Sequence, residues 1–252
     1  MAEEIVIVTG GSRGIGASVC RKLAAGGRTV LVNFARNSDA ADELVDEIRA
    51  AGGTAVAVQG DVSDEADVLN LFAEADNLGT LTGLVNNAGI LDVAQRVDEM
   101  SLDRMTRIFS VNVIGSFLCA REAVRRMSTR LGGRGGSIVN LGSASSKLGS
   151  PGQYVDYAAA KGAIDTMTVG LALEVAQEGI RVNAVRPGII DTEIHASGGI
   201  PDRVARLQSR LPMKRAGSAD EVADAILWLM SDQASYTTGA ILDVSGGRAI
   251  LP

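Results

Sequence analysis

The sequence predicts a doubly wound, three-layer α/β/α fold with a mostly seven-stranded parallel sheet. Short apolar runs alternate along the chain with longer segments that repeat their apolar residues at the helical period. A glycine-rich turn joins the first such run to the first such segment, and no linker, repeat or low-complexity tract interrupts the alternation. Such alternation gives right-handed β-α-β units, whose helices cover both faces of a parallel sheet. We therefore expect residues 1–252 to form a single domain.

The expected elements follow from composition and periodicity. Valine-rich runs between glycine-rich joints favour strands that are buried on both faces. These strands are expected at residues 5–9, 29–33, 55–59, 84–86, 137–141, 181–185 and 241–244. Helical periodicity is found at residues 14–25, 39–51, 65–76, 102–131, 155–177 and 219–230. Gly52, Gly53 and Gly179 are positioned to end helices.

Composition excludes several classes of function. The net charge of −6 argues against nucleic acid as the main partner. No apolar run reaches the ~18 residues of a membrane helix, and the acidic start resembles neither a signal nor a transit peptide, so we expect a cytoplasmic protein with no membrane partner. Cys20, Cys119 and His195 are too few for a four-ligand Cys/His zinc site, and no metal site is expected. Both cysteines are expected to be buried and unreactive.

Residues 9–16, Thr9-Gly10-Gly11-Ser12-Arg13-Gly14-Ile15-Gly16, form the glycine-rich turn. Glycines let backbone N–H groups approach a pyrophosphate at a helix N-terminus, where the helix dipole favours anions. The spacing is G-x-x-x-G-x-G rather than G-x-G-x-x-G. Its position after a buried strand favours a Rossmann-type dinucleotide site over a merely structural turn. The predicted binding residues here are Gly10, Ser12, Arg13, Gly14, Ile15 and Gly16.

The predicted cofactor is NADP(H) rather than NAD(H). In NAD sites an acidic residue about 20 residues beyond the glycines binds the ribose 2′-hydroxyl. Here the second strand ends at Asn33, with Arg36 just beyond. Arg13 and Arg36 would grip a 2′-phosphate through bidentate hydrogen bonds. The alternative is that both arginines are solvated surface residues. Asp39, the nearest acid, is expected to begin the second helix.

Two further segments fit a cofactor cleft because they follow predicted strands. Asp61 and Val62 follow the third strand, where a carboxylate would accept a hydrogen bond from the adenine amino group. Asn87, Ala88 and Gly89 follow the fourth strand, and small residues there would let the backbone approach the cofactor.

Tyr157 and Lys161 lie four residues apart and therefore share one face of a predicted helix. A free tyrosine has a pKa near 10, and lowering that pKa by ~3 units requires about 4 kcal/mol, much of which one close cation can supply. The phenol would then exchange a proton with an alkoxide or alcohol near neutral pH. Tyr154 has Ala158, not a cation, at the matching position. Ser143 follows the fifth strand, at the sheet edge where ligands bind, and would hydrogen-bond the substrate oxygen.

Asn112 lies inside a long apolar stretch, where its amide needs a partner. From spacing alone it is either a satisfied core residue or part of the site. Taken together, these residues resemble the short-chain dehydrogenase/reductase family over nearly the whole chain. Five motifs occur in the order and spacing of that family, at residues 9–16, at 86–89, at Asn112, at Ser143 with Tyr157 and Lys161, and at Pro187-Gly188.

The resemblance implies a role for each residue of an oxidoreductase site. Tyr157 is the acid/base, and Ser143 orients the carbonyl and stabilises its developing charge. Lys161 binds the nicotinamide ribose and lowers the pKa of Tyr157, and Asn112 holds a water that relays protons to Lys161. The segment that passes the nicotinamide includes Pro187, Gly188, Ile190 and Thr192.

The substrate is not encoded in any motif, but the closest family type is the 3-oxoacyl-acyl-carrier-protein reductase. We expect a small-molecule carbonyl or alcohol: a 3-oxoacyl thioester, a ketone or a sugar. Residues 192–212 are expected to form a lid over it, with His195 at the surface or lining the substrate. The alternatives are a non-catalytic dinucleotide sensor and an epimerase or dehydratase on the same fold. The intact set of four site residues argues against the sensor.

Five arginines in one stretch would attract an acidic acyl carrier protein. The alternative is a solvated or subunit-facing helix. These residues are Arg121, Arg125, Arg126, Arg130 and Arg134. The family resemblance also implies a homotetramer, with residues 228–247 at a subunit contact.

Overall fold

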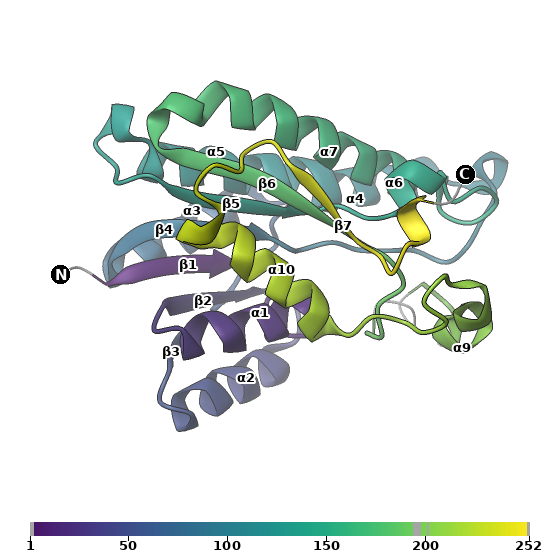
Figure 1. The fold of residues 1–252 in the computed structure, drawn as a ribbon, viewed down its shortest axis with the longest axis horizontal. Coiled ribbons are helices and arrows are strands. Elements are labelled where there is room, and N and C mark those ends of the chain that lie inside the picture. The colour runs from purple at the N-terminus through teal and green to yellow at the C-terminus, as the bar shows by residue number, and fades with distance from the viewer. Residues whose placement is uncertain (1–2, 194–197, 201, 251–252) are drawn as a thin grey trace.

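Seven parallel strands form the centre of the molecule in the order β3-β2-β1-β4-β5-β6-β7 (Figure 1). The structure, a computed structural model, describes residues 3–193, 198–200 and 202–250. The strands are β1 (Glu4–Val8), β2 (Thr29–Phe34), β3 (Thr54–Gln59), β4 (Thr80–Asn86), β5 (Gly136–Leu141), β6 (Ile180–Pro187) and β7 (Ile241–Val244). The strand order reverses between β1 and β4, which is the position where open parallel sheets bind ligands.

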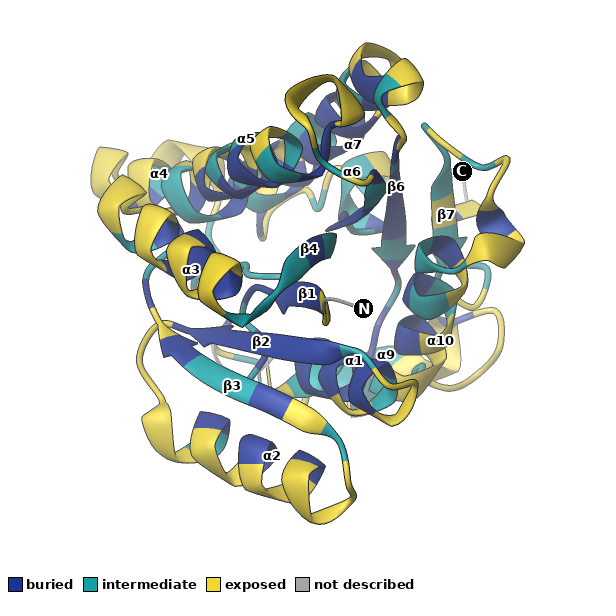
Figure 2. Ribbon diagram, turned by 90° about the vertical axis from the view of Figure 1, so that its left-hand side faces the viewer, coloured by how far each residue is buried: buried dark blue, intermediate teal, exposed yellow. Residues whose placement is uncertain are grey.

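Helices cover both faces of this sheet, as Figure 2 shows. One face carries α1 (Gly14–Ala25), α2 (Ser38–Ala50) and α10 (Ala219–Met230). The other carries α3 (Glu65–Leu78), α5 (Gly115–Met127) and α7 (Val155–Val175), with α4 (Leu102–Phe109) packed against α7. The expected three-layer Rossmann-like fold is therefore confirmed. No helix in the described ranges is long and apolar enough to cross a membrane.

The alternation of side chains along β1 creates two separate cores. Val6 and Val8 pack into the core beneath α1, α2 and α10. Ile5 and Ile7 point to the opposite face and pack into the core beneath α3, α5 and α7. All four side chains are fully buried, as expected for a strand covered on both faces.

Some predicted boundaries are wrong. The continuous helix expected over residues 102–131 is interrupted by the π-helical segment Ser110–Ile114, ends at Met127 and is followed by a 3₁₀ turn at Thr129–Leu131. The strand expected at 84–86 begins at Thr80. Its first half was not predicted because Thr80 and Thr82 are polar and interrupt the apolar run. Two short helices were not expected, α6 (Ser145–Leu148) and α9 (Arg203–Leu207). Both lie beyond the carboxyl ends of the strands (Figure 1).

Candidate active site

The glycine turn between β1 and α1 is packed so closely that side chains do not fit. A Cβ added to Gly16 would lie 2.5 Å from the carbonyl oxygen of Gly10 and 2.6 Å from Nδ2 of Asn87. Gly10 and Gly14 adopt positive φ angles of 59° and 54°, which favour glycine. Arg13, the residue before α1, makes no side-chain hydrogen bond to the first turn of the helix. The first N–H groups of α1 are therefore left uncapped by a side chain, an arrangement that suits an anionic ligand.

Two asparagines hold this turn in place. Nδ2 of Asn33 donates to the Gly60 carbonyl at 2.9 Å, and its Oδ1 accepts from the Gly10 N–H at 3.3 Å. Nδ2 of Asn87 donates to the carbonyls of Thr9 and Gly10, both at 2.8 Å. Asn33 is buried, so the amide expected beside the adenosine ribose serves to brace the turn against β2 and β3. Its contact with a cofactor stays a prediction.

The predicted phosphate-binding arginines are both exposed. Nη1 of Arg13 lies 3.6 Å from a carboxylate oxygen of Glu193, and exposed pairs of this kind bind weakly. Arg36 follows the end of β2. Asp39 lies in the first turn of α2, as expected, although Asn37 caps that helix. At the third strand, Oδ1 of Asp61 accepts hydrogen bonds from the backbone and hydroxyl of Ser63 at 2.9 and 2.7 Å.

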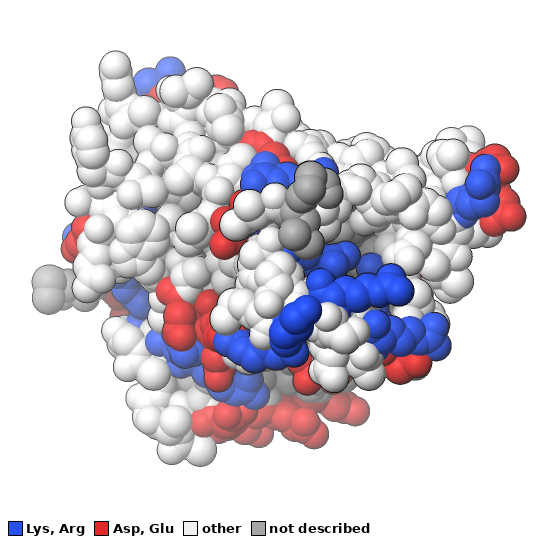
Figure 3. All heavy atoms as spheres, turned by 45° about the vertical axis from the view of Figure 1, so that its right-hand side comes forward, with Lys and Arg blue, Asp and Glu red and all other residues white. Residues whose placement is uncertain are grey.

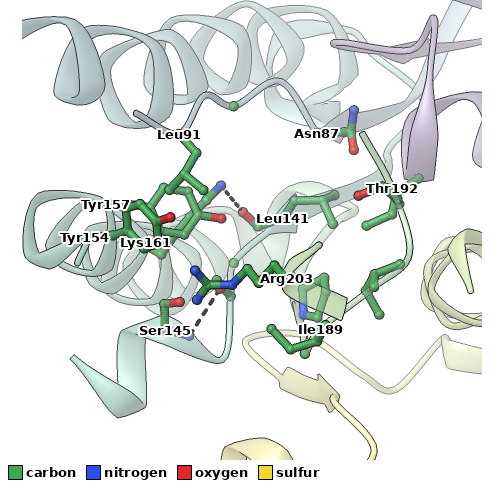
Figure 4. A pocket seen from close by; sticks show the side chains of 17 residues that line it. Asn87, Leu91, Leu141, Ser145, Tyr154, Tyr157, Lys161, Ile189, Thr192 and Arg203 are labelled. Carbon is green, nitrogen blue, oxygen red and sulfur yellow. Dashed lines mark hydrogen bonds between the residues drawn. The ribbon is translucent and has the colours of Figure 1, made fainter. Parts of the chain in front are cut away.

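Tyr157, Lys161 and Ser143 meet in one cavity, which we call the catalytic cavity (Figure 4). Tyr157 and Lys161 come from α7, and Ser143 follows the end of β5. The same cavity is lined by residues from the glycine turn, from the segment after β4 and from the segment after β6, among them Ile15, Asn87, Gly89, Pro187, Gly188, Ile190 and Thr192. The structure thus brings together the predicted catalytic triplet and many of the predicted cofactor-binding residues.

The protonation of Tyr157 differs from the expectation. Burial raises the pKa of Tyr157, and a hydrogen bond with Ser143 and the charge of Arg203 only partly offset this effect. The net shift of this pKa is upward, opposite to the shift that the sequence predicted. Nζ of Lys161 donates to the Leu141 carbonyl at 2.7 Å and lies 5.7 Å from the centroid of the Tyr157 ring. Burial also lowers the pKa of Lys161 to about 8. Tyr157 therefore holds its proton at neutral pH, which suits a proton donor.

Asn112 is fully buried in the π-helical segment, and its amide pairs with the peptide groups of Ile90. Oδ1 accepts from the Ile90 N–H at 2.7 Å, and Nδ2 donates to the Ile90 carbonyl at 2.9 Å. A Cβ on Gly89 would lie 3.3 Å from Oδ1 of Asn112 and 3.5 Å from Nζ of Lys161. Asn112 is thus a satisfied buried residue that also lies close to Lys161. Its role in holding a water stays a prediction.

Sequence reasoning missed a buried ion pair beside Tyr157. Arg104 of α4 donates from Nε and Nη2 to the Asp156 carboxylate at 2.8 and 3.2 Å. Oδ1 of Asp156 also accepts from the Tyr157 N–H at 2.9 Å. The pair therefore fixes the start of α7, from which Tyr157 projects. The sequence feature that could have indicated this site is Asp156 itself, an acidic residue in the first turn of the helix, where the helix dipole favours negative charge.

Tyr154 and Arg203 also line the catalytic cavity, which the sequence did not indicate. Tyr154 is buried, and its hydroxyl donates to the Gly198 carbonyl at 3.2 Å. The guanidinium of Arg203 lies 5.0 Å from the centroid of the Tyr154 ring. Within the expected lid, Thr192 and Arg203 thus reach the cavity. His195 lies outside the described residues.

The arginine stretch on α5 is largely neutralised by neighbouring acids. Arg121, Arg125 and Arg126 surround the buried carboxylate of Glu122, with N–O distances of 3.0, 2.8 and 2.9 Å. Arg130 lies 3.3 Å from Glu178. Burial acts to raise the pKa of Glu122, but the arginines more than offset it and hold that pKa below its usual range. The stretch is therefore less basic than its sequence indicates.

The two cysteines, Cys20 and Cys119, are free and buried, as expected. Their burial raises the pKa of both thiols. Neither lines the catalytic cavity. Among the described residues no group of three or more His, Cys, Asp or Glu side chains is arranged to hold a metal ion.

Comparison with known proteins places this geometry in context. A family model described as Enoyl-(Acyl carrier protein) reductase matches residues 10–249. The chain is 56% identical over 245 residues to the uncharacterized oxidoreductase YgfF of Escherichia coli, covering 97% of this chain and 99% of the relative. It is 39% identical over 247 residues to glucose 1-dehydrogenase 2 of Bacillus subtilis, covering 98% and 95%. A solved short-chain dehydrogenase/reductase from Serratia marcescens is similar with a TM-score of 0.89 at 31% identity, covering 98% of both chains.

Proposed function

The chain belongs to the short-chain dehydrogenase/reductase family, and from that premise we propose that it is an NADP(H)-dependent oxidoreductase with Tyr157 as its acid/base. It reduces a carbonyl group or, in reverse, oxidises a secondary alcohol. The observation that carries this proposal is one shared cavity, in which Tyr157, Ser143 and Lys161 meet residues of the glycine turn and of the segment that follows β4. A sensor would have no need of a proton donor and an oxygen-binding hydroxyl beside its dinucleotide.

The glycine turn fits a nicotinamide dinucleotide on its own geometry. Gly10 and Gly16 pack against Ala88 and Asn87 without room for side chains, so backbone N–H groups rather than side chains face an incoming pyrophosphate. Ile190 and Thr192, beyond the end of β6, would hold the nicotinamide end inside the catalytic cavity. When bound, the cofactor supplies or accepts a hydride, and the remaining chemistry falls to the side chains of the cavity.

Carbonyl reduction requires a proton for the oxygen on which negative charge develops. The Ser143 hydroxyl orients that oxygen by hydrogen bonding and stabilises the charge. Tyr157, which keeps its proton because burial raises its pKa, donates it to the same oxygen. The ammonium of Lys161, fixed by its 2.7 Å bond to the Leu141 carbonyl, favours the phenolate left behind. Alcohol oxidation reverses each of these steps.

Tyr157→Phe tests this assignment, because phenylalanine keeps the ring and removes the proton. We expect kcat for NADPH-dependent reduction, followed by absorbance over a panel of ketones, sugars and 3-oxoacyl thioesters, to fall by at least about 10³-fold. NADPH affinity should remain, as measured by fluorescence titration. Substantial residual turnover would overturn the role of Tyr157. Product formation without net change in NADPH would instead favour the epimerase or dehydratase alternative.

The preference for NADP(H) is supported by the end of β2. No Asp or Glu stands there, Asn33 is buried in the brace, and Arg13 and Arg36 are exposed. We expect Arg36→Ala to lower kcat/KM for NADPH about 10-fold or more, the range of a lost charge-assisted hydrogen bond, while NADH is affected far less. Arg49→Ala, an exposed arginine in α2, is the matched control. A wild-type preference for NADH would refute the proposal.

The acyl carrier protein receives little support from the surface of α5, because four carboxylates pair with four of the five arginines and compensate most of the arginine charge. These acids are Glu65, Asp76, Glu122 and Glu178. This compensation favours the alternative of a solvated or subunit-facing helix. The double substitution of Arg125 and Arg126 by alanine decides between them. If the carrier protein docks on α5, the double variant should raise KM for a carrier-linked substrate and leave KM for a free ketone unchanged. If the helix is only solvated or faces a subunit, KM for the two substrates should not differ in this way.

A homotetramer is supported by large apolar side chains that the single chain leaves exposed. Phe117 on α5 and Leu173 on α7 are 51% and 76% exposed, and Trp228 on α10 is 41% exposed. Burial of such side chains against another subunit is favourable by roughly 25 cal/mol per Å². Light scattering after size-exclusion chromatography should give four times the 26.0 kDa chain mass. A monomer would contradict this.

A further inference from the structure

Arg203 carries a positive charge into the substrate end of the catalytic cavity. It begins α9, is half-buried and lines the same cavity as Tyr157 and Ser143. In Figure 4 its guanidinium points toward Tyr154 and Ser145, and away from Asn87 and Thr192. Because Asn87 contacts the glycine turn, the charge is directed to the end of the cavity opposite the expected cofactor site.

Within the described part of the chain, this guanidinium has no carboxylate partner. Asp202, its neighbour in sequence, pairs with Arg206 at 2.7 Å, and Glu193 faces Arg13. The described lining of the catalytic cavity contains two cations, Lys161 and Arg203, and no Asp or Glu. The ammonium of Lys161 is already bonded to a carbonyl. Arg203 is therefore the cation in this lining whose hydrogen-bond donors remain available to a ligand.

Neighbouring charges reinforce this positive field. Burial and the charge of Arg203 lower the pKa of Arg248, so a second cation lies near the first. Figure 3 shows basic side chains gathered on the side of the molecule that carries α9. A guanidinium in a partly dry cavity without a counter-charge binds an anion more strongly than it would in water. Leu91 and Ile189 give the same cavity an apolar wall that would accommodate a carbon skeleton.

We propose that Arg203 binds a carboxylate of the substrate, so that the enzyme acts on oxo acids and their hydroxy-acid counterparts rather than on neutral carbonyl compounds. The inference rests on the proposed function, because it assigns a substrate class to the same cavity. A guanidinium matches a carboxylate through two parallel N–H···O bonds. A neutral substrate would leave the half-buried donors of Arg203 without a charged partner, and loss of such a pairing discriminates between substrates.

Two matched pairs of probes test this proposal: 4-acetylbenzoate and 4-oxopentanoate, each compared with its methyl ester. The readouts are kcat/KM from NADPH oxidation, and the dissociation constant from calorimetry on the Tyr157→Phe enzyme loaded with NADPH. For at least one pair we expect the wild-type enzyme to favour the acid by roughly 10- to 100-fold, the range of charge-assisted hydrogen bonds. Arg203→Met, which keeps an apolar stem over Tyr154, should abolish this preference for the acid over its ester. Arg203→Lys should retain part of the preference.

Arg206→Met is the matched control, because Arg206 lies on the same helix with an exposed side chain paired to Asp202. It should keep the wild-type ratio. The proposal is overturned if neither acid is favoured in binding, or if Arg203→Met lowers acid and ester equally, as a purely structural contact with Tyr154 would require. It is also overturned if Arg203→Met weakens NADPH binding instead, because the guanidinium would then serve the cofactor. Preferential binding of the acids without NADPH oxidation would count against the proposed function and leave standing only the part of this inference that makes Arg203 a carboxylate-binding residue.

Discussion

Removing the carboxylate of Asp156 should destabilise the protein and misplace Tyr157. The side chains of Arg104 and Asp156 are only 6% and 2% exposed, so Asp156→Ala would leave a guanidinium charge buried without its counter-ion. Breaking a buried pair in this way costs about 3–5 kcal/mol. Arg104 keeps a hydrogen bond to Gln95 at 3.1 Å and another to the Val93 carbonyl. These remaining contacts put the expected loss near the lower end, at about 3 kcal/mol.

For a chain of this length, about 3 kcal/mol corresponds to a fall in Tm of roughly 6–12 °C. Urea unfolding followed by circular dichroism measures the free-energy change, at one fixed protein concentration because the proposed subunit association would also stabilise the fold. Arg104→Met combined with Asp156→Leu removes both charges and should be less destabilised than Asp156→Ala alone. The same Asp156→Ala variant should lose kcat, because the 2.9 Å bond that holds the Tyr157 N–H is gone.

Asp98→Ala is the matched control. The pair Arg96–Asp98 has a similar distance, 3.0 Å, but its side chains are 72% and 63% exposed. Exposed pairs contribute about 0–1 kcal/mol, so this variant should unfold almost as the wild type does. If Asp156→Ala were destabilised no more than Asp98→Ala, or if the double variant were as unstable as the single one, the reasoning from burial would be refuted.

Three further results are expected. Burial lowers the folded-state pKa of Lys161 from 10.5 to about 8, which disfavours the folded state by roughly 3 kcal/mol below pH 8, and this penalty disappears as pH rises from 8 to 10.5. Lys161→Met should therefore be inactive but, after loss of one hydrogen bond, about 1–2 kcal/mol more stable to urea at pH 7. The gain should vanish between about pH 9 and 10, where the remaining penalty equals the lost hydrogen bond, and no gain at pH 7 would contradict this. Gly16→Ala should weaken NADPH binding at least about 10-fold because its Cβ would lie 2.5 Å from a carbonyl oxygen, whereas Gly170→Ala, with open space around it, should bind normally. Cys20 and Cys119, whose pKa values burial raises, should both be unreactive toward Ellman's reagent in the folded protein and react only in denaturant.

The sequence alone determined the features that are local in the chain. Strand and helix periodicity predicted the layered sheet, because each element must bury an apolar face. The glycine spacing predicted a turn at residues 9–16 that lets the backbone approach a ligand, and the structure leaves no room there for a side chain on Gly16. The four-residue spacing of Tyr157 and Lys161 predicted that both lie on one helix face, because helix geometry fixes that relation whatever the surroundings.

Only the tertiary structure decided partners and burial. Arg104 and Asp156 are 52 positions apart in the chain, and Arg203 lies in α9 whereas Tyr154 directly precedes α7, so no local pattern pairs them. Burial also raises the pKa of Tyr157, in the direction opposite to the expected shift, because desolvation outweighs the hydrogen bond with Ser143 and the charge of Arg203. The chain thus encodes its chemistry in short motifs, whereas the fold sets the environment of those motifs and brings Arg203 to the cavity that Tyr157 and Ser143 line.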